Sequence, residues 1–150
     1  MALLALAALL LFTGCRTVPP APSVNLNDPA WTVRQGQAVW TPERGAEGIA
    51  GELMLATQPD GSCWMQFSKP PFTIMTASHL ANRWHIEFQQ GSQRYGGAGA
   101  PPARLAWFQL ANALSGQPTR AHWEFSHDAD DGWLLKHSKR GEKLEGYFHP

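Results

Sequence analysis

The sequence predicts a mostly β protein of the α+β class, in which one apolar helix covers one face of an antiparallel sheet. Two observations predict this class. Short segments with alternating apolar and polar residues, separated by turn residues, follow one another through most of the chain, as in strands with one buried and one solvent-exposed face. Within residues 31–150, only segment 103–114 is apolar in a helical pattern.

The first strands are expected between residues 31 and 67. Segment 31–40 forms the first strand, and apolar residues alternate with others in segment 48–57. Asp60-Gly61 is a hairpin turn signal before a third strand over 63–67. The inward residues expected on the second and third strands are Ile49, Gly51, Leu53, Leu55, Cys63, Met65 and Phe67.

The next strands follow a break at Lys69-Pro70-Pro71. On the fourth strand the expected inward set is Phe72, Ile74 and Thr76. The fifth strand, 83–89, alternates most clearly, and Gly91-Ser92 then turns the chain into a short strand at 93–95. On the fifth strand we expect Trp84, Ile86 and Phe88 to be buried, and Arg83, His85, Glu87 and Gln89 to face solvent.

A glycine- and proline-rich loop over 96–102 leads into the predicted helix, 103–114, which Ser115-Gly116 ends. The helix's few polar side chains cover less than half of its circumference, so we expect it to be enclosed on more than one side. Three short strands, over 121–126, 133–137 and 143–148, complete the predicted sheet.

Cys15 follows an uncharged, apolar N-terminal segment. The segment is shorter than the roughly 20 residues that span a bilayer, but it has the length of a secretion signal. Gly14-Cys15 resembles the lipobox of bacterial lipoproteins, which implies cleavage before Cys15 and its acylation, for example with palmitate. The alternative is a buried first helix of a cytoplasmic domain. We expect a signal peptide at 1–14, a lipidated cysteine and proline-rich tether at 15–30, and one domain at 31–150.

The order of these segments resembles the LolB-type outer-membrane lipoprotein receptors, over about residues 31–137. The matching stretches are Gly48–Leu53, Trp64–Phe67 and the helical segment with its Leu-Ala-Trp-Phe-Gln-Leu core. The resemblance implies a curved open antiparallel sheet, a half-barrel, with helical cover over a hollow that receives acyl chains. The nearest counterpart of the family's membrane-contacting loop is the compact segment 68–72, which offers only Phe72. By the sorting rule of enterobacteria, Arg16 after the cysteine implies delivery to the outer membrane, where the protein would face the periplasm.

These features predict a lipoprotein that binds an acyl chain or a lipidated partner, such as another lipoprotein, between sheet and helix. The substitutions Phe88→Arg and Phe108→Arg are expected to abolish uptake. The residues expected to line the hollow are Leu53, Leu55, Met65, Phe67, Ile74, Trp84, Ile86, Phe88, Leu105, Trp107 and Phe108.

A packed core made of the same residues is the alternative. The protein would then be a structural or adaptor lipoprotein that recognises an envelope protein through an exposed face or sheet edge. A cavity of roughly 300 Å³ or more between helix and sheet favours a ligand, and tight packing favours the adaptor.

Other functions are disfavoured by composition. Lys plus Arg and Asp plus Glu both number 12, so the neutral chain has no general attraction for nucleic acid. The six histidines lack metal-site spacing, and no nucleophile–base motif is present. Cys63 is expected to be a buried, inert thiol. We therefore expect no enzyme activity, cofactor or metal, and a monomer.

Overall fold

A computed structural model describes residues 21–89, 91–128 and 131–150. Cys15, the predicted signal peptide and the first part of the predicted tether lie outside the described residues. The described residues form one nine-stranded, wholly antiparallel sheet and one short helix packed against it, which confirms the predicted fold class. No helix among them is long and apolar enough to cross a membrane.

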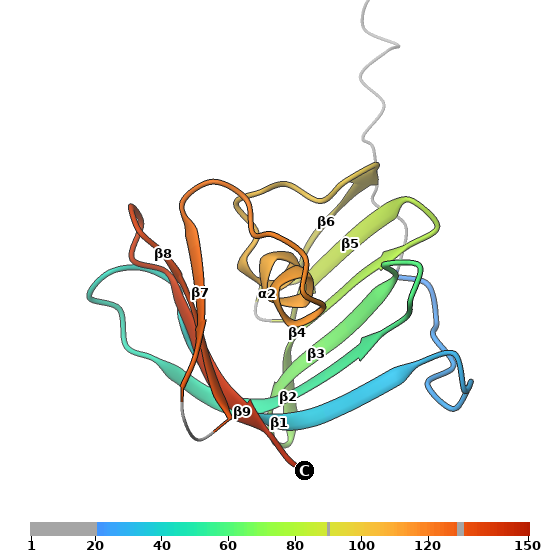
Figure 1. Ribbon diagram of the computed structural model, residues 1–150, viewed down its shortest axis with the longest axis horizontal. Coiled ribbons are helices and arrows are strands. Elements are labelled where there is room, and N and C mark those ends of the chain that lie inside the picture. The colour runs from blue at the N-terminus through green and yellow to red at the C-terminus, as the bar shows by residue number, and fades with distance from the viewer. Residues whose placement is uncertain (1–20, 90, 129–130) are drawn as a thin grey trace, which may run out of the picture.

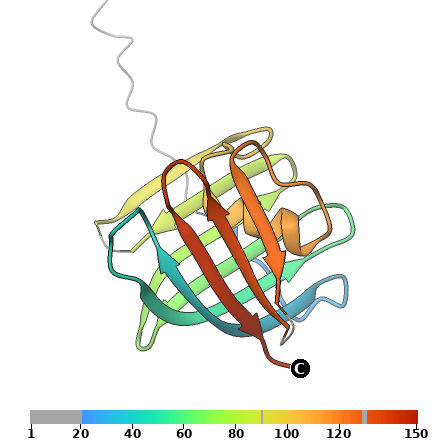
Figure 2. The same ribbon diagram turned by 60° about the vertical axis from the view of Figure 1, so that its left-hand side comes forward.

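The nine strands lie in the order β6-β5-β4-β3-β2-β1-β9-β8-β7, so the described part of the sheet is open, with β6 and β7 at its edges. Their bounds are β1 Thr32–Thr41, β2 Ile49–Thr57, β3 Cys63–Lys69, β4 Phe72–Leu80, β5 Arg83–Phe88, β6 Gln93–Ala98, β7 Trp123–His127, β8 Gly132–His137 and β9 Lys143–Phe148. The helix α2 spans Ala106–Leu114. The sheet curves around α2, which lies in its concave face between the β7–β9 end and the β4–β6 end (Figures 1 and 2).

The sheet bends where its concave face carries the smallest side chains. Gly146 of β9, Ala38 of β1 and Gly51 of β2 are paired in register across three neighbouring strands. A Cβ on Gly146 would lie 2.9 Å from the Trp133 ring, and one on Gly51 would lie 2.9 Å from the Phe67 ring. Glycine at such positions permits close backbone and ring approach, so this row lets the two ends of the sheet fold toward each other.

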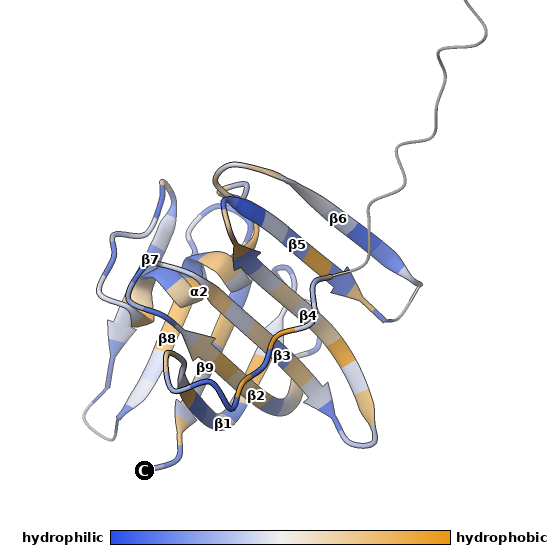
Figure 3. Cartoon of the chain, turned by 90° about the vertical axis from the view of Figure 1, so that its right-hand side faces the viewer, coloured by the Kyte–Doolittle hydropathy of each residue, from blue (hydrophilic) through white to orange (hydrophobic). Residues whose placement is uncertain are grey.

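The interior of the curve is filled with apolar side chains from every strand except β6, together with α2. Leu53, Leu55, Met65 and Phe67 alternate inward as predicted and are at most 2% exposed. On β5, Ile86 is fully buried, and Trp84 and Phe88 pack half-buried against the core. Figure 3 shows apolar residues alternating with polar ones along these strands.

The predicted inward set of β4 is wrong. A register irregularity between Phe67 and Ser68 leaves Ile74 without a partner in β3, so Met75 lies opposite Phe67. Because side chains alternate between faces, this one-residue bulge moves Met75 and Ala77 into the core, while Phe72 is 72% exposed. Ile74 is still buried, at the bulge itself.

Two further expectations need correction. The strand β6 includes Gly96, Gly97 and Ala98, which were expected in a loop. A Cβ on Gly97 would lie 2.9 Å from the Trp84 indole nitrogen, so a glycine here admits that ring. His85 was expected in solvent, but it is only 6% exposed on the outer face of the sheet, beside buried Ser78.

The helix α2 begins three residues later than expected, after a turn at 103–104, and Gly116 ends it in a left-handed conformation (φ 73°). Six consecutive residues of the helix are buried, Ala106 to Ala111, so it is enclosed on more than one side, as predicted. Even Gln109 is only 1% exposed, and its Oε1 accepts a hydrogen bond from the backbone N–H of Arg120 at 3.0 Å.

Candidate functional site

The centre of the concave face is filled by aromatic rings from both sheet and helix. The ring of Trp107 lies 5.2 Å from that of Phe67 and 5.6 Å from that of Trp40, and Phe108 lies 6.3 Å from Trp84. Trp40 also stacks on Phe88 at 5.8 Å. These centroid distances are those of direct ring contact. Residues predicted to line a hollow therefore contact one another across the helix–sheet boundary.

Space remains at one end of α2. A groove of about 590 Å³ lies between the last turn of the helix, the start of β1 and the β2–β3 turn. Its apolar lining comes from Leu114 and Pro59, with smaller parts from Cys63 and Ala111, and Arg34 provides its one basic side chain. The other lining residues are Thr32, Thr57, Gln58, Asp60, Gly61, Ser62, Asn112, Ser115 and Gln117.

None of the eleven residues predicted to line a hollow borders this groove. Seven of them are at most 2% exposed in the core (Leu53, Leu55, Met65, Phe67, Ile86, Trp107 and Phe108), Ile74 is 8% exposed, and Trp84, Phe88 and Leu105 pack half-buried against that core. Sequence reasoning missed Arg34, although its position in the alternation Arg34, Gly36, Ala38, Trp40 signals an inward-facing cation.

The thiol of Cys63 borders the groove but is only 6% exposed. Burial raises the pKa of this thiol to about 11, which outweighs the opposing effect of a hydrogen bond with the backbone of His79. A neutral, buried thiol is a poor nucleophile and a poor metal ligand. Its chemistry in the groove is that of a small apolar side chain.

Two indole N–H groups in the core, those of Trp107 and Trp133, are buried without an acceptor among the described residues. A buried donor without a partner costs about 1–3 kcal/mol. A ligand oxygen that reached either group would remove that cost, whereas an alkyl chain alone would leave it. The interior is therefore apolar with a small number of polar groups, as ligand-binding interiors are.

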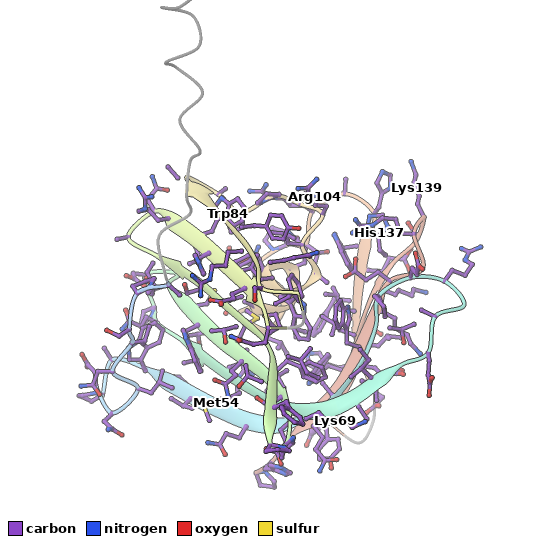
Figure 4. The ribbon with its side chains drawn as sticks, turned by 180° about the vertical axis from the view of Figure 1, so that it is seen from behind. Met54, Lys69, Trp84, Arg104, His137 and Lys139 are labelled. Carbon is purple, nitrogen blue, oxygen red and sulfur yellow. The ribbon has the colours of Figure 1, made fainter. Side chains whose placement is uncertain are left out.

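Two histidines, His122 in the turn before β7 and His137 at the end of β8, lie close together at the β7–β8 edge of the sheet. The rings of His122 and His137 lie 5.8 Å apart, and Nδ1 of His137 accepts the backbone N–H groups of Lys139 and Arg140 at 3.3 and 3.2 Å. Figure 4 shows His137 and Lys139 beside Arg104 at this rim. Desolvation, and then the charge of Arg140, lowers the pKa of His137. No group of three or more metal-binding side chains occurs within residues 21–89, 91–128 and 131–150.

Comparisons with known proteins do not assign the chain to a family: no family model matches it, and no curated protein is significantly similar to it.

Proposed function

We propose that this protein is a lipoprotein of the bacterial outer membrane, anchored through Cys15 and facing the periplasm, that binds an acyl chain or a lipidated partner between its sheet and α2. The observation that carries the proposal is the groove of about 590 Å³ that opens beside the apolar interior of a curved, open sheet. Its volume is within the range typical of ligand pockets, about 300–1,000 Å³.

The resemblance to LolB-type receptors supports the same function, because a curved antiparallel sheet with helical cover is the architecture it implies. Burial of an acyl chain is favourable by about 25 cal/mol for each Å² of apolar surface removed from water. Leu114 and Pro59 offer the exposed apolar surface at the groove, and Ala111 and Cys63, which are 4% and 6% exposed, belong to the same core cluster as the aromatic rings.

The helix α2 is suited to act as a lid. It has nine residues and no side-chain hydrogen bond at its N-terminus, and helices this short owe their stability to tertiary packing. Gly99 and Gly116, both with positive φ, flank it. Displacement of α2 from the aromatic cluster would open the predicted hollow, so the groove is proposed as the place where a chain enters.

Phe72 supports a role at a surface. It lies at the turn between β3 and β4, next to Lys69 in the register, and its 72% exposure exceeds that of Val33, Tyr95 and Tyr147, the other exposed large apolar side chains of the described residues. An apolar side chain held in solvent at a turn beside a cation suits contact with a membrane or with a lipidated partner.

Native mass spectrometry of residues 16–150, purified from cells and then incubated with lipids, tests the proposal. We expect a fatty acyl or phospholipid adduct, identified by organic extraction. The substitution Leu114→Arg should remove the adduct, because it places a charge on the apolar lining of the groove. Leu134→Arg, on the outward face of β8, is the matched control and should leave the adduct unchanged. A protein that stays free of lipid after incubation would contradict the proposal.

A second function is favoured by the ring contacts of Trp107 and Phe108, which fill the centre of the concave face. The protein would then be an adaptor lipoprotein with a solid core that binds an envelope protein through an exposed face. Arg83 is exposed on the outer face of β5, but His85 is buried, and the side chain of Glu87, paired with Arg94 at 2.9 Å, is only 14% exposed, so neither of these two contributes to such a surface in the predicted way. A lipid-free mass together with capture of an envelope protein that Arg83→Glu disrupts would favour this function.

A further inference from the structure

Arg34 is a cation on the apolar face of the sheet. In the β1–β2 register it lies opposite Leu55, which is 1% exposed in the core. The inward positions that follow it on β1 are Gly36, Ala38 and Trp40. Its side chain borders the groove, and desolvation lowers its pKa. The guanidinium is therefore partly desolvated.

The contacts of Arg34 leave its charge without a carboxylate partner among the described residues. Its Nη2 donates one long hydrogen bond, 3.4 Å, to the carbonyl oxygen of Leu114, and the guanidinium lies 4.9 Å from the centre of the Phe148 ring. Asp60 is the one acidic residue that borders the groove, but its carboxylate accepts from the backbone N–H and hydroxyl of Ser62 at 2.8 and 3.1 Å.

Capping of α2 does not account for this arginine. The carbonyl groups of Ala111, Asn112 and Ala113 at the end of the helix already accept hydrogen bonds from the backbone N–H groups of Ser115, Gly116 and Gln117, at 2.8 to 3.1 Å. Arg34 adds only the long contact to Leu114. Most of the five N–H donors of the guanidinium therefore remain available at the groove.

A planar guanidinium binds carboxylate and phosphate groups through paired hydrogen bonds, and partial burial strengthens such bonds. The groove places this group beside the apolar surface of Leu114 and Pro59, since Ala111 and Cys63 are only 4% and 6% exposed. We propose that Arg34 binds the anionic head, a carboxylate or a phosphate, of an amphiphile whose alkyl chain lies along this apolar surface. The inference rests on the proposed function, to which it adds the class of ligand.

Binding measurements on the full chain carrying Cys15→Ser, which cannot be acylated, test the inference. The probes share a twelve-carbon chain and differ in the head: dodecanoate, dodecyl phosphate, dodecanol and dodecyltrimethylammonium, each below its micellar concentration. Inorganic phosphate is the probe without a chain. We expect the two anionic amphiphiles to bind at least tenfold more tightly than dodecanol, and the cationic one more weakly than dodecanol.

The variant Arg34→Gln separates head-group binding from a structural role. It should reduce the affinity for both anionic amphiphiles to that of dodecanol and leave the affinity for dodecanol unchanged. Arg34→Lys should retain part of the preference, because the charge remains but the planar fork is lost. The matched control Arg83→Gln, on the outer face of β5, should retain the full preference. Thermal unfolding of each variant shows whether it folds. If Arg34→Gln does not fold, the inference is tested by whether the unsubstituted chain binds anionic amphiphiles more tightly than dodecanol.

Each contrary result has a distinct meaning. Equal binding of anionic and neutral amphiphiles, or an equal loss for all probes in Arg34→Gln, would overturn the role of Arg34 and leave the proposed function in place. Binding of inorganic phosphate as tight as that of dodecyl phosphate would overturn the assignment to an amphiphile. Absence of binding for every amphiphile would overturn both the inference and the proposed function.

Discussion

At the scale of single residues, the side chains that face inward on their strands determine the chemistry of the groove. Cys63 of β3 and Arg34 of β1 lie on inward positions of two strands that β2 separates, and both border the groove. Burial disfavours the charged form of both groups: it raises the pKa of the thiol, which stays neutral, and lowers the pKa of the guanidinium, which keeps its charge because arginine is not deprotonated in proteins. Cys63 therefore contributes to the apolar lining, and Arg34 is the basic group of the same groove.

The thiol of Cys63 should be unreactive in the folded protein. At pH 8 a pKa of about 11 leaves roughly one thiolate in a thousand, and the side chain is only 6% exposed. In the full chain with Cys15→Ser, we expect reaction with a disulfide reagent to be at least about 100-fold slower in buffer than in urea. Ser126→Cys, which adds an exposed thiol, is the control and should react rapidly; equally rapid reaction of Cys63 would show that the groove region opens readily.

The same shift in the pKa of Cys63 predicts how stability depends on pH. The folded-state pKa, about 11, is above the ordinary value of 9.0, so the folded protein favours the neutral thiol. This contribution is fully present below pH 9 and is lost as the pH rises from 9 to 11, since only the unfolded chain then ionises. Urea unfolding at pH 8 and pH 10.5 should show a loss of about 1–2 kcal/mol that Cys63→Ala removes. The same loss in Cys63→Ala would assign it to another group.

At the scale of elements, the bulge in β4 determines which side chains reach the core. The sequence pattern suggested Phe72, Ile74 and Thr76 as the inward set, yet Met75 and Ala77 are the fully buried residues of this strand. The extra residue has no partner in β3, and a shift of one residue exchanges the two faces of a strand. For the helix α2 the sequence was sufficient: its apolar pattern predicted that it is enclosed, and this prediction did not depend on how the strands pair.

Substitutions on the two faces of β4 should differ sharply in cost. We expect Met75→Ala to destabilise the protein by about 2–5 kcal/mol, because it leaves a cavity beside Phe67 and Phe88 in a core where Met75 is fully buried. Phe72→Ser should change the free energy of unfolding by at most about 0.5 kcal/mol, since Phe72 is mostly in solvent. Urea unfolding of both variants measures the difference. A larger loss of unfolding free energy in Phe72→Ser would mean that Phe72 packs in the core.

At the scale of the whole molecule, curvature brings distant parts of the chain together. The row Gly146, Ala38 and Gly51 crosses the middle of the sheet, and the strands on either side of it face each other across α2 (Figure 1). Larger residues in this row would keep those strands apart. The groove and the aromatic cluster both depend on this bend, because each combines residues from the sheet with residues from the helix.

Gly51→Val should therefore disturb the whole domain. Its side chain would meet the carbonyl oxygen of Ser68 and the ring of Phe67, and we expect a loss of about 1–3 kcal/mol or more in the free energy of unfolding. Ala50→Val, at the neighbouring exposed position of β2, is the matched control and should be close to neutral. Thermal unfolding measures both; a neutral Gly51→Val would mean that this row does not set the curvature.

The sequence by itself determined the strands, the single enclosed helix and the membership of most of the core, because alternation and helical periodicity are local patterns imposed by one buried face. It did not determine the bulge at Ile74, the burial of His85 or the strand character of Gly97, each of which depends on which residue lies opposite. Only the tertiary structure decided that Trp107 and Phe108 fill the centre, and that Arg34, Cys63 and Leu114 meet at one groove. At this site a strand residue contacts a helix residue 80 positions away in the sequence, and no local sequence pattern encodes such a contact.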